Sequence, residues 1–119
     1  MKWEFNGKGP IAAQIVLLVE QAIARGELAP GEWLPSVREL AAEASVNPNT
    51  MQKALLELEQ NGLVNTVRNT GKSVTTDTEL IRATRDRLVE ESIRAFLADM
   101  KSLGLDRAEV SALMERRVS

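Results

Sequence analysis

The sequence predicts a mainly α-helical protein with one small β-hairpin, in which a winged helix-turn-helix domain over residues 1–77 precedes a two-helix tail over residues 78–119. Three observations favour this fold class. Apolar residues recur at helical spacing in five segments. Two of these segments are separated by only Ala44, Ser45 and Val46, a connection typical of the helix-turn-helix arrangement. Two β-prone stretches follow them and complete the pattern of a winged helix.

Length and composition limit the functions that the chain can have. Its 119 residues suit one modest domain with an appendage, and 44% hydrophobic with 27% charged residues is typical of a globular protein. Cysteine and histidine are both missing from the sequence, which excludes disulfides, Cys/His zinc sites, thiol nucleophiles and imidazole acid–base catalysis. The acidic residues lack the spacing of a metal-binding loop. We therefore expect neither an enzyme nor a protein that needs a metal or other cofactor.

The N-terminal segment and the charge balance give expectations about location and partners. The sequence shows no signal peptide and no apolar run near the about 20 residues of a spanning helix, so we expect a cytoplasmic protein without a membrane partner. The net charge is −2, and residues 1–77 hold seven basic and nine acidic residues. Because non-specific affinity for nucleic acid comes from basic excess, any DNA binding depends on where the charges lie.

The first predicted helix begins after Pro10 and ends at Gly26. Beyond it, Pro30 and Gly31 supply the fixed φ and the positive φ of a type II turn. The face of this helix that we expect to be buried consists of Ile11, Ile15, Leu18 and Ala22. The aromatic residues outside the tail, which we expect to seal the small core, are Trp3, Phe5 and Trp33.

Start signals mark both helices of the predicted helix-turn-helix. Ser36 and Glu39 have the spacing of a capping box, in which each side chain bonds a free backbone amide of the first turn. Asn47 suits the N-cap of the next helix and Pro48 suits its first position. The opposite face of that helix is polar at its N-terminal end, where groove-reading residues of such a motif belong. Its apolar face consists of Met51, Ala54, Leu55 and Leu58.

The hairpin and the tail follow. Residues 63–67 and 73–75 are the expected strands, and residues 68–72 are the expected loop. A long helix with apolar residues at alternating spacings of four and three then presents a seam suited to a partner helix. Because the last helix, capped by Asp106, offers too few apolar residues to cover that seam, we expect a homodimer. The alternative is a tail that folds back on its own winged helix. The expected dimerisation residues are Leu88, Val89, Ile93, Phe96, Leu97, Met100, Leu103, Val110, Leu113 and Met114.

Five motifs lie in register over residues 10–75. They are Pro10-Ile11, Gly26-Glu27-Leu28-Ala29-Pro30-Gly31, Leu34-Pro35-Ser36-Val37-Arg38-Glu39-Leu40, Val46-Asn47-Pro48-Asn49-Thr50 and Leu58-Glu59-Gln60-Asn61-Gly62-Leu63. Together they closely resemble the GntR family of bacterial transcription regulators, and the short tail looks like the two-helix dimerisation tail of the YtrA subfamily. The resemblance implies a homodimer that binds a palindromic operator on double-stranded DNA, usually as a repressor.

The resemblance also implies which residues contact DNA. Arg38 matches the family arginine that follows Pro-Ser and contacts DNA. The wing departs from the family's usual Arg-Gly-x-Gly pattern, because Asn69 replaces the first glycine and Ser73 replaces a later aromatic. Asparagine tolerates positive φ, so we expect the turn to survive. The candidate DNA contacts are Ser36, Arg38, Asn47, Asn49, Thr50, Gln52, Lys53, Arg68, Thr70, Gly71 and Lys72.

Alternatives stay open at this point. Arg38 could instead pair with Glu43 on its own helix, and Arg68 and Lys72 could be ordinary solvated charges of a hairpin. The whole chain could be a winged-helix module for protein association, which the acidic balance of residues 1–77 favours mildly. A small-molecule effector, where one exists, is expected between the tail helices or between the tail and the winged helix.

Overall fold

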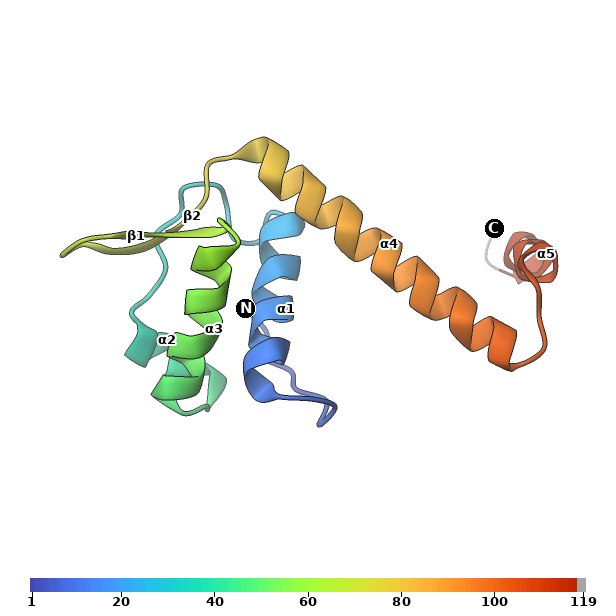
Figure 1. Ribbon diagram of the computed structural model, residues 1–119, viewed down its shortest axis with the longest axis horizontal. Coiled ribbons are helices and arrows are strands. Elements are labelled where there is room, and N and C mark those ends of the chain that lie inside the picture. The colour runs from blue at the N-terminus through green and yellow to red at the C-terminus, as the bar shows by residue number, and fades with distance from the viewer. Residues whose placement is uncertain (118–119) are drawn as a thin grey trace. The chain divides into compact units, whose positions relative to one another are not determined.

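The computed structural model describes residues 1–117 and confirms the predicted fold class (Figure 1). The chain forms two compact units, one from Met1 to Arg85 and one that begins at Asp86. We call the first the winged unit and the second the tail unit. The helices are α1 (Ile11–Ala24), α2 (Val37–Ala44), α3 (Pro48–Gln60), α4 (Thr78–Ser102) and α5 (Arg107–Arg117), and the strands are β1 (Val64–Val67) and β2 (Gly71–Val74).

The core of the winged unit is built by α1, α2, α3 and the hairpin. α1 packs against α3, and α3 also packs against α2 and β1. The apolar face of α3 is buried as its spacing predicted. Removal of these apolar side chains from water supplies the main free energy that holds the unit together. The largest fully buried side chains are Ile15, Ile23, Met51, Leu55, Leu58, Leu63, Val64 and Val74.

The buried face of α1 differs from the predicted one. Ile15 and Ala22 are buried as expected, but Ile11 is exposed and Leu18 is only half-buried. Apolar residues cover most of the circumference of α1, so periodicity alone did not determine which face meets α3. The buried apolar residues that the periodicity missed are Val16, Val19 and Ile23.

Both helices of the helix-turn-helix begin at their predicted caps. Ser36 Oγ accepts a hydrogen bond from the amide of Glu39 at 3.1 Å, and Glu39 Oε1 accepts one from the amide of Ser36 at 3.2 Å. Asn47 Oδ1 accepts a hydrogen bond from the amide of Asn49 at 2.8 Å. Ser45 has a left-handed φ of 57°, which lets the chain turn sharply between α2 and α3.

The hairpin loop is shorter than predicted. β1 and β2 pair antiparallel along their whole lengths, so the loop contains only residues 68–70. Gly71 and Lys72, expected in the loop, belong to β2. Asn69 has a φ of 63°, as expected for the residue that replaces a family glycine. Gly71, the first residue of β2, also has a positive φ of 140°, and its pairing with Val67 leaves a loop of three residues.

Trp33 does not seal the core, and the prediction for this residue is wrong. Its side chain is 53% exposed, whereas Trp3 and Phe5 pack against the core as expected. The backbone of Trp33 forms an antiparallel bridge with Ser73 of β2. The neighbouring Leu34 packs against the core, and because side chains alternate along an extended segment, the indole of Trp33 points to solvent.

α4 begins in the winged unit and continues into the tail unit. Its first turn is capped by Asp77, whose Oδ1 accepts a hydrogen bond from the amide of Leu80 at 3.1 Å. Leu80 and Ile81 pack against the core, and Thr84 is buried. The winged unit therefore extends to Arg85, past the boundary after residue 77 that the sequence suggested.

The tail unit contains the rest of α4 and α5. A capping box starts α5 as predicted, with Asp106 Oδ1 accepting from the amide of Glu109 at 2.8 Å and Glu109 Oε1 accepting from the amide of Asp106 at 3.1 Å. Among residues 86–117, only Val110 is buried. None of the helices within residues 1–117 has both the length and the apolar character needed to cross a membrane.

Candidate nucleic-acid interface

The exposed face of α3 carries residues predicted to read DNA. The helix buries its apolar face and leaves the opposite face in solvent. Asn49, Gln52 and Lys53 are exposed, and Thr50 is half-buried. Within residues 1–117 these four side chains form no hydrogen bond or ion pair with the rest of the chain. Amide, hydroxyl and ammonium groups without internal partners are available to bond base edges and phosphates.

Two exposed arginines flank α3 in the sequence and are also unpaired. Arg38 lies in the first turn of α2, and Arg68 begins the hairpin loop. Neither guanidinium forms an ion pair in the part of the chain that the structure describes, so the alternative pairing of Arg38 with Glu43 is not formed. A cation in the first turn of a helix is disfavoured by the helix dipole, so Arg38 gains nothing from its own helix. Both charges are available to an external anion.

Ser36 and Asn47 use their side-chain oxygens as helix caps. Each oxygen accepts a backbone amide of the helix that it starts, so it is partly occupied within the chain. The Ser36 hydroxyl hydrogen and the Asn47 amide hydrogens remain available as donors. These two residues can therefore donate to a phosphate while they fix the starts of α2 and α3, which carry Arg38 and Asn49.

Lys72 has a different environment from the exposed loop that the sequence suggested. Its Nζ lies 3.3 Å from Glu59 Oε2 on α3 and donates a hydrogen bond to Thr66 Oγ1 on β1 at 2.8 Å. Only 15% of its side chain is exposed. The lysine thus ties the hairpin to α3, and its charge is largely balanced within the winged unit. Thr70 and Gly71, by contrast, are exposed.

Glu59 and Thr66 support the wing, and sequence reasoning missed both. The Thr66 hydroxyl donates a hydrogen bond to Glu59 Oε1. This bond, together with the Lys72 ammonium, lowers the pKa of Glu59 against the opposing effect of burial. A usable signal was present in the sequence: Thr66 and Lys72 share strand parity with the buried Val64 and Val74, so their side chains lie on the same side of the hairpin.

The predicted dimerisation residues are largely exposed in the single chain. On α4, Val89 and Ile93 are 50% and 52% exposed, and Phe96 is 41% exposed. Leu103 lies just beyond the end of α4 and is exposed, as is Met114 of α5. Four of the remaining predicted residues are half-buried: Leu88, Leu97, Met100 and Leu113. The last one, Val110, is buried.

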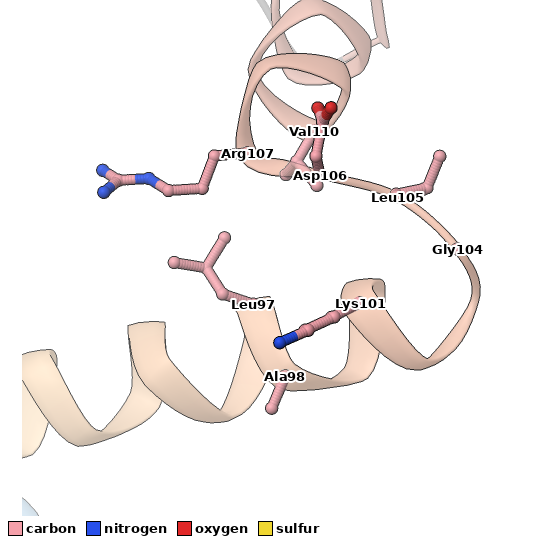
Figure 2. A pocket seen from close by; sticks show the side chains of 8 residues that line it. All are labelled: Leu97, Ala98, Lys101, Gly104, Leu105, Asp106, Arg107 and Val110. Atoms are coloured by element: carbon pink, nitrogen blue, oxygen red, sulfur yellow. The ribbon is translucent and has the colours of Figure 1, made fainter.

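A hollow of about 550 Å³ lies within the tail unit, between the end of α4 and the start of α5. Figure 2 shows the side chain of Leu97 projecting from α4 toward α5, with Arg107 on the opposite wall. Most of its surface is apolar, and Leu105 and Val110 contribute to the lining. This hollow adjoins predicted dimerisation residues, so it forms part of the apolar surface that the tail unit leaves uncovered.

The fold and the polar face of α3 agree with the pattern of a known family. The sequence pattern described as "Bacterial regulatory proteins, gntR family" matches residues 11–74, which is more than half of the chain. The chain belongs to the GntR family. GntR proteins are transcription regulators with a DNA-binding helix-turn-helix domain and are not enzymes. Within residues 1–117, no group of three or more His, Cys, Asp or Glu residues is placed to hold a metal ion.

Two relatives from Bacillus subtilis (strain 168) support the assignment over most of the chain. The HTH-type transcriptional regulator YhcF is 38% identical over 107 residues, which cover 90% of this chain and 88% of YhcF. The HTH-type transcriptional repressor YtrA is 33% identical over 99 residues, which cover 82% of this chain and 75% of YtrA. The similarity therefore includes the tail, and the resemblance to YtrA is confirmed.

Solved structures with a similar fold support the same family assignment. A GntR family transcriptional regulator from Listeria monocytogenes superposes with a TM-score of 0.86 at 35% identity, covering 94% of this chain and 98% of that chain. The DNA-binding domain of AraR in complex with operator ORX1 superposes with a TM-score of 0.57 at 26% identity, covering 63% of this chain and 96% of that domain. The AraR domain, which has a similar fold, is thus bound to operator DNA.

Proposed function

We propose that this GntR protein is a dimeric, sequence-specific repressor that binds a palindromic operator in the cytoplasm. The observation that carries the proposal is a set of polar and basic side chains with no partners within the described chain: Arg38, Asn49, Gln52, Lys53 and Arg68. The assignment as a repressor follows the name of YtrA, which aligns with 82% of this chain.

The side chains suggest a division of roles at the DNA. Asn49 and Gln52 have amide groups that match an adenine edge in the major groove. Lys53 and Arg68 are suited to phosphates, which supply affinity and register but little sequence information. Arg38 can bond a guanine edge in two places at once, as arginine commonly does.

The tail supports the dimeric part of the proposal. Val89, Ile93 and Phe96 form an exposed apolar face on α4, and large exposed apolar patches commonly mark interaction sites. Burial of such a face is worth roughly 25 cal/mol per Å², which offsets the entropic cost of association over a few hundred Å². Two-fold symmetry would then present two α3 helices to DNA about 34 Å apart or a multiple of that distance, as a palindromic operator requires.

A second candidate function is a winged-helix module that associates with proteins rather than with specific DNA. Residues 1–77 hold nine acidic and seven basic residues, a balance that opposes non-specific attraction to phosphate. In that case the unpaired side chains of α2 and α3 would face a protein partner.

A salt titration separates the two functions. Full-length protein is titrated against a duplex selected from a random pool and against its scrambled version, from about 50 to 200 mM salt. A DNA-binding regulator should prefer the selected duplex, with affinity falling linearly against log salt. Lys53→Ala and Arg68→Ala should each flatten that slope by about one unit, and Lys72→Ala by less because Glu59 balances its charge.

The matched control is Lys8→Ala, which removes an exposed lysine from the N-terminal segment and should leave the slope unchanged. Affinity that neither depends on salt nor distinguishes the selected duplex would favour the protein-association module. Equal effects of Lys8→Ala and Lys53→Ala would contradict the location of the interface.

A further inference from the structure

Arg68, a proposed DNA contact, lies at the tip of a short hairpin (Figure 1). It begins the loop between β1 and β2, and each of these strands has four residues. Apolar packing holds the hairpin at its base, where Val64 and Val74 pair with each other and are buried. From residue 65 to residue 73 no side chain is buried. Because a two-stranded hairpin is marginally stable alone, the position of its tip depends on further contacts.

Backbone hydrogen bonds hold one edge of the hairpin. The amide of Leu34 donates to the carbonyl of Lys72 at 2.9 Å, and the amide of Val74 donates to the carbonyl of Glu32 at 2.8 Å. These bonds join β2 to the segment that precedes α2. In the described part of the chain, β1 pairs with β2 alone. β1 is therefore the outer strand, and the place of its end, from which Arg68 continues, depends on side chains.

Three side chains make that contact, and we call them the clamp: Glu59 of α3, Thr66 of β1 and Lys72 of β2. The Thr66 hydroxyl donates to Glu59 Oε1 and accepts from Lys72 Nζ at 2.8 Å. Lys72 Nζ also donates to Glu59 Oε2 at 3.3 Å. Thr66 and Lys72 are directly paired across the two strands, and Thr66 lies two residues before Arg68. The clamp thus binds both strands to α3 close to the loop.

The clamp links two parts of the proposed DNA interface. α3 carries Asn49 and Gln52, and a duplex has to meet these residues and Arg68 at the same time. When the distance between them is set in the free protein, less ordering has to be paid for on binding. We infer, on the basis of the proposed function, that Glu59 is a positioning residue for DNA binding: through the clamp it sets the place of Arg68 relative to α3.

A simple charge argument predicts the opposite effect of Glu59. A carboxylate near DNA repels phosphates, and its removal would also free Lys72 to bind one, so charge alone predicts tighter binding by Glu59→Gln. Loss of the clamp predicts weaker binding. Glu57→Gln is the matched control, because Glu57 lies on the same helix, is exposed and has no partner in residues 1–117. It removes the same charge and leaves the clamp intact.

Fluorescence anisotropy on the selected duplex compares the full-length variants, after circular dichroism has shown that each is folded. Loss of about one net hydrogen bond should make Glu59→Gln bind about threefold to tenfold more weakly than the unmodified protein. Glu57→Gln should bind equally well or more tightly. In an Arg68→Ala background, Glu59→Gln should change affinity by less than about twofold, because the clamp acts through Arg68.

Two substitutions at Thr66 test the clamp without changing any charge. Thr66→Val removes the hydroxyl that joins Glu59 to Lys72 and keeps a branched side chain on the strand. We expect it to weaken DNA binding, as Glu59→Gln does. Thr66→Ser keeps the hydroxyl and should bind within about twofold of the unmodified protein. Equal affinities of the two variants would contradict the role of the hydroxyl.

Backbone ¹⁵N relaxation without DNA tests the clamp directly. In the unmodified protein, the amides of residues 68–70 should be nearly as rigid as those of α3. In Glu59→Gln and in Thr66→Val these loop amides should become more mobile on the nanosecond timescale, whereas those of Val64 and Val74 at the buried base should not change.

Three results would overturn the inference: tighter DNA binding by Glu59→Gln, an equal loss of affinity from this substitution in the Arg68→Ala background, or unchanged mobility of the loop. A failure of the proposed function gives a different result, since the unmodified protein would then show no preference for the selected duplex in the salt titration. The unmodified protein and the variants therefore report on the two proposals separately.

Discussion

The winged unit buries most of its large apolar side chains, whereas the tail unit leaves most of its large apolar side chains partly or largely exposed. In the winged unit, three helices and the hairpin bury residues such as Leu55, Leu58 and Val74 almost completely. In residues 86–117 only Val110 is buried, and large side chains such as Ile93 remain about half exposed. The winged unit therefore closes its core by itself, whereas the tail unit carries apolar surface that a second copy is expected to cover.

The largest expected effect concerns the core of the winged unit. Leu55→Ala should lower the free energy of unfolding by about 2 to 5 kcal/mol, because it removes a fully buried side chain and leaves a cavity. Leu56→Ala is the matched control on the next residue, which is 48% exposed, and should cost less than about 1 kcal/mol. Urea denaturation measures both. Similar losses for the two variants would show that the α3 faces are assigned wrongly.

The next effect concerns assembly through the tail. Ile93→Asp places a charge at the centre of the exposed face of α4, and an unpaired charge buried in an interface costs about 3 kcal/mol or more. We expect the dimer dissociation constant to rise on the order of a hundredfold, as measured by sedimentation equilibrium.

Ala95→Asp is the control for the tail. It introduces the same charge at an exposed position about 120° away from the face of Val89, Ile93 and Phe96. The dissociation constant of this variant should stay close to that of the unmodified protein. A monomeric parent protein, or equal weakening by both variants, would remove the proposed role of the tail.

Arg38→Ala tests whether contact with DNA in the winged unit is independent of dimer assembly through the tail. Loss of a guanidinium that bonds a base edge should weaken operator binding by about 1 to 3 kcal/mol without changing stability or oligomeric state. Arg25→Ala, which removes an arginine paired with Glu27, should leave operator affinity unchanged. Fluorescence anisotropy on the selected duplex measures both. Unchanged affinity in a folded Arg38→Ala dimer would exclude this arginine from the interface.

The smallest expected effect lies in the hairpin support of the winged unit. The pKa of Glu59 is below its usual value of 4.5 in the folded protein, chiefly because of the Thr66 hydrogen bond. A lowered folded-state pKa means that the ionised carboxylate stabilises the fold at pH values above 4.5. This contribution is lost as the pH falls below 4.5 through the folded-state pKa.

Glu59→Gln should therefore reduce stability at pH 7 by up to about 1 kcal/mol, and the difference from the unmodified protein should shrink below pH 4.5. Glu57→Gln is the control, because Glu57 is exposed and has no partner in residues 1–117. Urea denaturation at a series of pH values measures the difference. A deficit for Glu59→Gln that is constant with pH would exclude the ionised Glu59 as its source.

The sequence by itself determined the order of the elements and the starts of α2, α3 and α5. Ser36 with Glu39, and Asn47 with Pro48, act within one turn of the chain, so their caps form as predicted. The apolar face of α3 was also predictable, because its polar residues leave a single face to bury. The candidate DNA contacts were identified from the family motifs, because no local physical signal distinguishes them from other exposed polar residues.

Only the tertiary structure decided which apolar residues of α1 are buried and which charged residues form ion pairs. α1 has apolar residues around most of its circumference, so the position of α3 selected Val16 and Val19 over Ile11. Lys72 became a partner of Glu59 because strand pairing places it facing a helix thirteen residues away in the sequence. Such choices depend on contacts between distant segments, whose geometry is set by the packing of the whole unit and by no local spacing.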